Sequence, residues 1–309
     1  MGYKVTAASG RDLFPLNRSH NTWNGPIVGP VDGVYHFYVP YYGNYTGIPS
    51  LFRVDYMLHG RARDIEGPYD WSAEPTVPRG INPAALAFEN VSSGKPVYTL
   101  WDGGVLASDS PDGPWRSVGR GCGSNPAPAH AGGIFYCTTQ HTREVLTAPQ
   151  VGGPWTKLGD VNVTLTNGST MAYADALPNV EDPFLWVDRR GNFHIINHRF
   201  NLSETDDCFS STLSAHTFSP DGKRWHILEP AVEPYAHTVQ YDDGTSKTFA
   251  ALERPNIHFD ASGQMTHINL AADMATGDAG CAPSSHGARP CDECKFYNHC
   301  GTVIIALDV

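Results

Sequence analysis

The sequence is poor in charge, and poorest of all in lysine. Only 17% of its 309 residues are charged, six are lysine, and the net charge at pH 7 is −11. So acidic a chain is unsuited to nucleic acid or an anionic membrane surface, and we expect neither as a partner. No apolar run approaches the length of a membrane span, and the first residues do not read as a signal peptide.

Helical periodicity is missing as well, because no stretch of about twelve residues shows an amphipathic helical pattern. The chain instead holds 31 Gly, 24 Pro and many aromatics (13 Phe, 14 Tyr and 7 Trp), and 40% of it is hydrophobic. Such a mixture is typical of many short strands joined by turns around a large core. The composition therefore predicts an all-β protein, a class that reaches this length as one domain.

Two marks recur in alternation along the chain. The first, which we call an opening, is a polar residue shortly before a proline that begins an apolar strand. The second, a closing, is a Gly-Pro or Asp-Gly turn leading to tryptophan. The openings are Asn24-Gly25-Pro26, Asn82-Pro83, Asn125-Pro126, Glu181-Asp182-Pro183 and Glu253-Arg254-Pro255. The closings end at Trp71, Trp115, Trp155 and Trp225.

Five such units predict a five-bladed β-propeller with four-stranded antiparallel blades, in one domain over residues 1–309. One blade cannot bury both faces alone, whereas a closed ring gives every blade two neighbours. The closing tryptophans would fill space between blades. The strand 301–308 would complete the last blade, with a cysteine-rich loop at about 278–300 before it. The alternative is an irregular β-sandwich in which the prolines coincide by chance.

Glycosylation sequons are more frequent than the roughly two that composition predicts. Six are present, at Asn17, Asn44, Asn90, Asn162, Asn167 and Asn201. Sequons occupy surface loops of secreted proteins, so we expect an extracellular glycoprotein whose signal peptide has been trimmed. A cytosolic chain is the alternative.

The seven cysteines fit an oxidising compartment. Cys122 and Cys137 bracket one expected hairpin and predict a disulfide. Two further bridges would join Cys281, Cys291, Cys294 and Cys300 in one of three connectivities, with Cys208 left over. The alternative for the last group is a zinc site of Cys291, Cys294, Cys300 and His299, for which one CxxC is weak support. We expect no required cofactor, and a structural metal ion in the central channel is left open.

In a propeller the innermost strands line the channel, so all five openings converge at one end of it. The residues placed around that pocket are Asn24, Asn82, Asn125, Glu181, Asp182, Glu253 and Arg254. Carboxylates that share a polar cleft have their pKa values pushed apart, so that one serves as acid and another as base or nucleophile. That pairing cleaves glycosidic bonds. Four aromatics could stack on sugars there, or belong to the blade cores: Trp23, Tyr38, Trp101 and Trp186.

The openings and closings resemble those of the five-bladed propeller glycosidases, namely glycoside hydrolase family 43 and the invertase/levansucrase group. The resemblance spans nearly the whole chain and implies a carbohydrate substrate, with Glu181 as general acid. The family carries its general base directly before the first opening's proline, where this chain has Gly25 after Asn24. At the third opening the family's pKa-modulating aspartate is replaced by Asn125.

A second carboxylate must then come from elsewhere, and we rank Glu253 first because its spacing to proline matches that of Glu181. An ion pair with Arg254 is the alternative role for Glu253. Asp182 is a second candidate, but it follows Glu181 directly, so strand alternation would turn it away from the pocket unless the strand bulges. Asp102 is a third candidate or a plain turn residue.

Four more side chains are candidates for substrate binding. His198 and His141 could reach a sugar hydroxyl, and His198 also a metal, although a lone histidine is often structural. Arg199 and Arg254 could pair with an acidic sugar.

Three functions compete. The first is a secreted glycoside hydrolase, expected to be a monomer. The second is a catalytically silent carbohydrate-binding propeller, because amides at three openings bind sugars but cannot take a proton. The third is a sialidase-like enzyme, suggested by turns such as Ser219–Trp225, although no arginine triad is evident.

Overall fold

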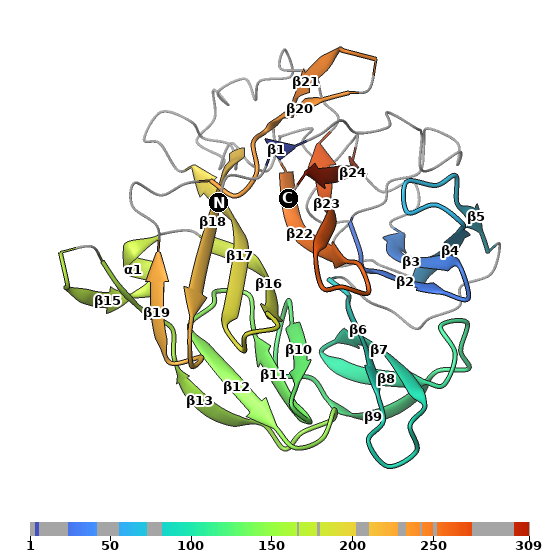
Figure 1. Cartoon of the computed structure of the whole chain (residues 1–309), viewed down its shortest axis with the longest axis horizontal. Coiled ribbons are helices and arrows are strands. Elements are labelled where there is room, and N and C mark those ends of the chain that lie inside the picture. The colour runs from blue at the N-terminus through green and yellow to red at the C-terminus, as the bar shows by residue number, and fades with distance from the viewer. Residues whose placement is uncertain are drawn as a thin grey trace, which may run out of the picture. The chain divides into compact units, whose positions relative to one another are not determined.

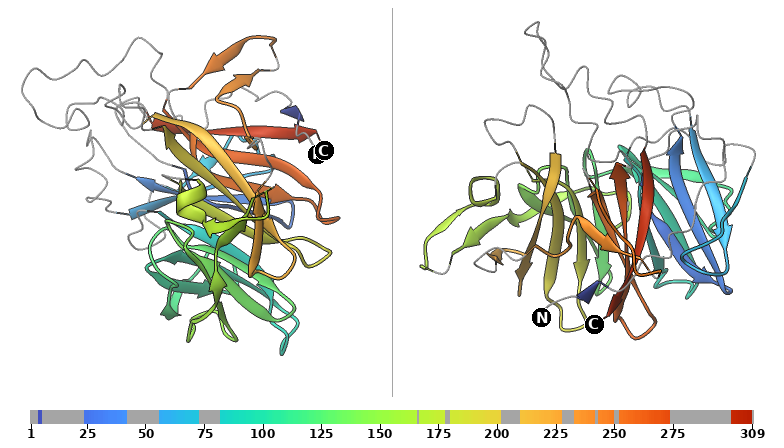
Figure 2. Two further views of the ribbon diagram at one scale, coloured as in Figure 1. Left: turned by 90° about the vertical axis from the view of Figure 1, so that its left-hand side faces the viewer. Right: turned by 90° about the horizontal axis from the view of Figure 1, so that it is seen from above.

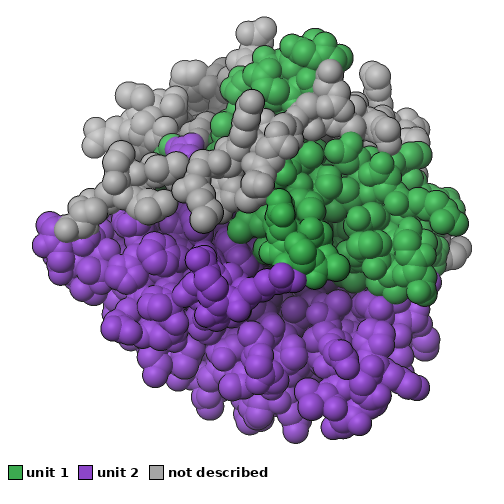
Figure 3. All heavy atoms as spheres, viewed as in Figure 1, with its two compact units in different colours: residues 1–81, 198–214, 235–309 green, residues 82–197, 215–234 purple. Residues whose placement is uncertain are grey.

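The computed structural model describes residues 4–5, 24–41, 56–72, 82–165, 167–177, 180–201, 210–227, 233–241, 243–249, 252–273 and 300–308. These residues belong to two compact units (Figure 3). Unit 1 comprises residues 1–81, 198–214 and 235–309, and unit 2 comprises residues 82–197 and 215–234.

Unit 1 contains the first and the last blade. The first blade is a four-stranded sheet in the order β2 (Ile27–Val31), β3 (Val34–Tyr41), β4 (Tyr56–Ala62) and β5 (Asp70–Trp71). The last blade has the order β22 (Leu252–Phe259), β23 (Met265–Asp273), β24 (Cys300–Asp308) and β1 (Lys4–Val5). A separate hairpin consists of β20 (Thr238–Gln240) and β21 (Ser246–Thr248).

Unit 2 contains the second and third blades, which repeat the four-stranded arrangement. The second blade is β6 (Ala84–Glu89), β7 (Pro96–Asp102), β8 (Gly104–Ser108) and β9 (Arg116–Arg120). The third blade is β10 (Ala127–Ala131), β11 (Ile134–Thr138), β12 (Glu144–Ala148) and β13 (Thr156–Asp160). The first strand of the third blade, β10, contacts both β6 and β16.

The fourth blade is wider than the others. Its strands are β16 (Val180–Val187), β17 (Phe193–Asn201), β18 (Ser210–Ser219) and β19 (Arg224–Ile227). Residues 198–201 of β17 and 210–214 of β18 belong to unit 1. A hairpin of β14 (Asn162–Thr164) and β15 (Thr170–Ala172) extends the sheet to six strands because β14 pairs in parallel with β19. The four-residue helix α1 (Tyr173–Ala176) follows β15. We call residues 161–177 the insertion.

Five successive four-stranded blades confirm the predicted all-β, five-bladed propeller fold. The single domain over residues 1–309 stays a prediction. In the first three blades the opening proline directly precedes the first strand, where no ladder N–H is needed. No helix among the described residues is long and apolar enough to cross a membrane.

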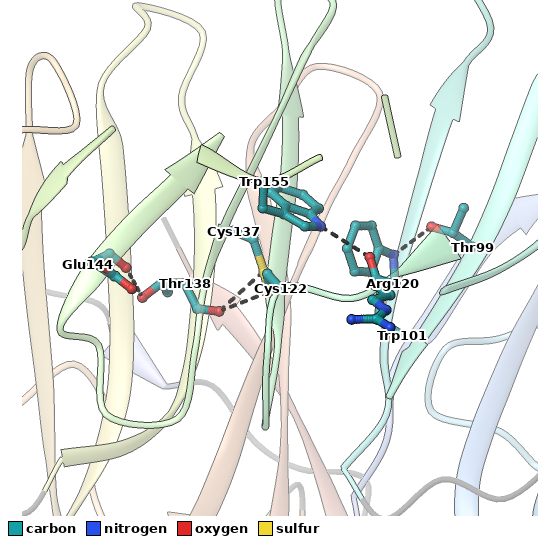
Figure 4. Close-up of a disulfide and its surroundings, with 8 residues drawn as sticks. All are labelled: Thr99, Trp101, Arg120, Cys122, Cys137, Thr138, Glu144 and Trp155. Carbon is teal, nitrogen blue, oxygen red and sulfur yellow. Dashed lines mark hydrogen bonds between the residues drawn. A yellow bond between two sulfur atoms is a disulfide. The ribbon is translucent and has the colours of Figure 1, made fainter. Parts of the chain in front are cut away.

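The closings lie where the repeat predicts them, at the last strand of a blade. Trp225 is completely buried in the core of unit 2. Trp155 packs on Trp101 of the preceding blade, with ring centroids 5.7 Å apart, and donates its indole N–H to the carbonyl of Arg120 at 3.1 Å (Figure 4). This closing tryptophan fills space between blades, as predicted.

The predicted Cys122–Cys137 disulfide is present and is drawn beside Trp155 in Figure 4. Its Cα atoms are 6.3 Å apart. Cys137 lies on β11 and is completely buried, so the bridge fixes the loop before β10 to the middle of the third blade. The other bridges and the zinc alternative lie outside the described residues, as do Cys208, Cys281, Cys291, Cys294, His299, Trp23, Asn17 and Asn44.

A buried amide clasp joins the first blade to the last within unit 1. Asn269 on β23 donates through Nδ2 to Oδ1 of Asn24 at 2.6 Å and to the carbonyl of Gly25 at 3.0 Å. Asn24 in turn donates to the carbonyl of Arg254 at 2.8 Å. The strands that carry this clasp, β22 and β23, run side by side with β24 (Figures 1 and 2).

Three aromatic rings stack on the fourth blade. Trp186 lies nearly parallel to His194 and His216, with centroids 4.8 and 5.7 Å away. Nδ1 of His194 is 3.1 Å from Nε2 of His216. Burial, and then the charge of His194, lowers the pKa of His216 to about 4.

This stack predicts a loss of stability in mild acid. The unfolded pKa of a histidine is near 6.5, so as the pH falls this side chain is protonated at a higher pH in the unfolded chain than in the folded one. The stability is therefore complete above about pH 6.5 and falls as the pH drops toward 4. Between pH 7 and pH 4, the free energy of unfolding should fall by roughly 3 kcal/mol less in His216→Gln than in the wild type, as measured by urea unfolding. A variant with the wild-type pH dependence would contradict the assignment.

Candidate active site

The local backbone at the openings is unusual. The residue directly before the opening proline adopts a left-handed conformation in three blades, with φ of 45° at Asn125, 48° at Asp182 and 50° at Arg254. Residues other than glycine rarely adopt this conformation, and where they do they cluster at ligand-binding and active sites. The start of each of these innermost strands is therefore bent at the residue whose side chain the sequence places in the site.

The carboxylates of Glu181 and Asp182 lie together. Their oxygen atoms come within 4.8 Å of each other. Gln140 donates its side-chain N–H to Oε1 of Glu181, and Asn125 donates to Oδ1 of Asp182. Both amides belong to the same end of the third blade, where the backbone N–H of Gln140 binds the carbonyl of Ser124 at 3.0 Å.

The carboxylate of Asp182 therefore lies beside that of Glu181, as expected only where the strand departs from regular alternation. Strand alternation holds for an extended backbone, and the left-handed φ of Asp182 interrupts it. Asp182 is buried and Glu181 is partly exposed. The pair presents one accessible and one covered carboxylate at the start of β16.

A relay of amides connects the openings of unit 2. Asn82 donates to Oδ1 of Asn125 at 2.5 Å, and Asn125 passes the contact on to Asp182. The second, third and fourth openings thus meet, as the propeller prediction requires. Oδ1 of Asn82 is buried and has no hydrogen-bond partner within the described part of the chain. An unsatisfied buried acceptor is costly, so this oxygen is suited to a donor from a ligand.

Behind the acid pair lies a second layer of polar side chains. Asn197 on β17 donates through Nδ2 to the carbonyl of Glu181 at 3.2 Å and to Oγ1 of Thr142 at 3.0 Å. Its own Oδ1 accepts from the hydroxyl of Tyr173 at 2.9 Å. Tyr173, Asn197 and Thr142 are each at most 1% exposed.

In unit 1, the first and fifth openings meet through the clasp. Asn24 is 1% exposed and uses its amide on Arg254 and Asn269, so its role in the structure is internal. The backbone N–H of Arg254 lies 3.5 Å from Nδ1 of His198. Glu253 is 5% exposed on β22, opposite Ala271.

Gly25 explains why the family's base position is vacant here. A Cβ atom at Gly25 would lie 1.8 Å from the carbonyl oxygen of Tyr38, far inside contact distance. The backbone of the first blade therefore admits no side chain at this position.

The other predicted binding residues lie at the same ends of their blades. Asp102 ends β7 at the turn before Gly104, and His141 is exposed after β11. Arg199 is half-buried on β17, and its Nε is buried with no partner among the residues described.

Of the two roles left open for the aromatics, burial supports the blade core for the three that the structure describes. Trp101 and Tyr38 are completely buried, and Trp186 is 7% exposed beneath His194 and His216. Trp101 donates its indole N–H to Oγ1 of Thr99 (Figure 4). A ring without a free face cannot stack on a sugar, so these aromatics serve the blade cores.

The sequence interpretation missed Gln140, Asn197 and Tyr173. Gln140 lies in a loop with no pattern to mark it. Asn197 had a signal, because it is a polar residue directly after Ile195 and Ile196 in an apolar strand. A structural metal ion in the central channel stays a prediction.

No protein-family model and no curated protein matches the sequence. Solved structures do match over nearly its whole length. The α-L-arabinofuranosidase of Podospora anserina, in complex with cellotriose, has a TM-score of 0.54 at 10% identity over 100% of this chain and 97% of that chain. The GH43_1 enzyme from Xanthomonas citri has a TM-score of 0.54 at 11% identity, over 96% and 90%.

A family 117 glycoside hydrolase from the marine bacterium Zobellia galactanivorans also matches, with a TM-score of 0.52 at 15% identity over 99% of this chain and 90% of that chain. The chain has the fold of the propeller glycoside hydrolases. At this identity the likeness concerns the fold, and it confirms the predicted resemblance at that level. The propeller hydrolase fold brings far-separated openings together, as the contacts of each unit show.

Proposed function

We propose that the protein is a glycoside hydrolase that acts on an oligo- or polysaccharide, with Glu181 as its general acid. The observation that carries this proposal is the pair of carboxylates within 4.8 Å at the start of β16, each held by an amide of the neighbouring blade. The fold shared with glycoside hydrolases supports it. Glycosidic cleavage needs two carboxyl groups in different roles.

Glu181 suits the acid because it is the accessible member of the pair. Gln140 fixes the orientation of its carboxyl group through Oε1, and Asn197 fixes its main chain. In the reaction Glu181 would donate a proton to the departing glycosidic oxygen. Oδ1 of Asn82 would accept a hydrogen bond from a sugar hydroxyl.

The second carboxylate is assigned to Glu253, with Asp182 as its competitor. Glu253 ranks first because it holds the same place in the fifth opening as Glu181 in the fourth; burial does not separate the candidates, since Glu253 and Asp182 are both buried. In hydrolysis this group would activate water or attack the anomeric carbon. Glu253→Gln and Asp182→Asn, assayed as two single variants, separate the two candidates. The variant that lacks the catalytic base loses turnover with every leaving group.

The proposal is tested by incubating the wild-type protein with aryl arabinosides, xylosides and galactosides, and with plant and algal polysaccharides. Release of aryl alcohol or reducing sugar is the expected result. The neighbour in complex with cellotriose suggests cellotriose as a further ligand to test. The absence of turnover on every one of these substrates would contradict the proposal.

The second candidate function is a carbohydrate-binding propeller without catalysis. The amides at Asn82 and Asn125, and the absence of a side chain at Gly25, favour it, whereas the amide of Asn24 is used within the structure. Isothermal titration with the same sugars distinguishes the two, because binding without turnover supports the silent protein. The sialidase-like alternative gains no support.

We also propose that the protein is secreted and glycosylated. Asn90 and Asn167 lie in exposed turns, and the Oδ1 of each accepts backbone N–H groups of its own turn. Ser169 in the second sequon adds a hydroxyl contact at 2.7 Å. Both asparagines can carry a glycan without disturbing a strand.

Secretion from a eukaryotic host should therefore add glycans at Asn90 and Asn167. Intact-mass measurement and glycopeptide mapping should locate them, and Asn90→Gln and Asn167→Gln should each remove one. The same chain made without a secretory signal serves as the unmodified reference. A secreted protein with both sites unoccupied would contradict the prediction.

A further inference from the structure

We infer that Tyr173, in the insertion before the fourth blade, is a positioning residue for Glu181 and acts through Asn197. The inference rests on the proposed function in that it names what holds the general acid in place. It assigns a role to a segment outside the repeating pattern of four strands to a blade. All of the residues involved belong to unit 2.

The insertion is held firmly at both ends. The backbone N–H of Val161 donates to the carbonyl of Arg143 at 2.9 Å, and that of Tyr173 donates to the carbonyl of Val161 at 3.0 Å. Between these points β14 pairs with β19. The ring of Tyr173 packs in the same core cluster as Trp225 and Val163. Packing of the ring therefore fixes the position of the phenol independently of the hydrogen bond that its hydroxyl makes.

The hydroxyl of Tyr173 sets the direction of the Asn197 amide. It lies 2.9 Å from Oδ1 of Asn197, and a phenol donates to an amide oxygen. The amide nitrogen must then point the other way, toward Thr142 and the carbonyl of Glu181. Without that hydroxyl the amide could rotate by half a turn and place its oxygen against the carbonyl of Glu181, which is repulsive.

Asn197 contacts Glu181 at its main chain, where a shift would displace the catalytic carboxyl group most directly. The carbonyl of Glu181 directly precedes Asp182, whose left-handed φ bends the strand. At this bend the carbonyl of Glu181 accepts a hydrogen bond from the side chain of Asn197, and such a bond fixes the main chain there. A shift of about 1 Å in a catalytic group can cost about 100-fold in rate. A buried contact remote from substrate can thus control turnover.

The test is Tyr173→Phe, which keeps the ring in the core and removes only the hydroxyl. The matched control is Tyr69→Phe, because Tyr69 is also buried and donates its hydroxyl to a main-chain oxygen, that of Ile65, at 2.6 Å. We expect Tyr173→Phe to lower kcat about tenfold or more with KM within about twofold, and Tyr69→Phe to change neither. In a Glu181→Gln background Tyr173→Phe should have no further effect, since residues that act as a unit are not additive.

Hydrogen exchange of peptides covering Val180–Val187 supplies a readout that needs no activity. Faster exchange there in Tyr173→Phe, and not in Tyr69→Phe, is expected. If the wild type has no glycosidase activity, the proposed function fails while this measurement still decides the positioning role. Unchanged exchange would overturn the inference, as would a Tyr173→Phe effect on kcat of the same size with and without Glu181.

Discussion

Replacing Glu181 by glutamine is expected to reduce turnover of an unactivated glycoside by about 10²- to 10⁴-fold, the range that general acid catalysis contributes. Glutamine keeps the size of the side chain and its contact with Gln140, but it cannot deliver a proton. The loss should shrink sharply with a dinitrophenyl glycoside, because such a leaving group departs without protonation. Steady-state kinetics on both substrates measures the difference.

The control for this change is Glu89→Gln, at the opposite end of an innermost strand. Glu89 is exposed at the end of β6, paired with Pro96. The same chemical replacement there should leave both rates unchanged. Wild-type turnover in Glu181→Gln would remove Glu181 as the acid, whereas an equal loss on both substrates would point to a role other than proton donation.

Replacing Asn269 by leucine is expected to destabilise the fold by about 3 kcal/mol, the order expected for a few stranded polar groups. Asn269 is completely buried and uses both ends of its amide. Besides the two bonds to the Asn24 segment, its Oδ1 lies 2.6 Å from Nε2 of His258. Leucine would leave Asn24, Gly25 and His258 without this partner in a buried place. Urea unfolding monitored by tryptophan fluorescence measures the loss.

The matched control for the clasp is Asn256→Leu in the adjacent strand. Asn256 is half-buried and makes a single bond to the carbonyl of Arg254 at 3.1 Å, so about 1 kcal/mol is expected. The pair Asn24→Leu and Asn269→Leu should be coupled, the double variant losing less than the sum of the singles. Additive losses would show that the clasp is not one unit.

Much of the fold was readable from the sequence, because each blade repeats the same local chemistry. The opening prolines mark strand starts that need no ladder donor, and the closing tryptophans mark the last strands. The insertion was missed, although spacing gave a signal: the step from a closing tryptophan to the next opening proline is 11 residues from Trp115 to Pro126 but 28 from Trp155 to Pro183. A long step leaves room for extra strands.

The site was less readable, because it depends on backbone angles and on contacts between distant segments. The meeting of Asn82, Asn125 and Asp182 follows from blade symmetry. The left-handed φ of Asp182 does not, and strand alternation gave the wrong side for its carboxylate. The contact of Tyr173 with Asn197 joins an insertion to a strand core, and no sequence pattern encodes that pairing.

The pairing of β1 with β24 has a consequence for how the chain reaches its native state. Lys4 pairs with Asp308 and Val5 with Leu307, so two neighbouring strands of the last sheet come from segments some 300 residues apart. Closing so large a loop is entropically unfavourable until the intervening blades are formed. High-contact-order pairings of this kind form slowly, so the last blade should be the final part of the molecule to gain protection during refolding.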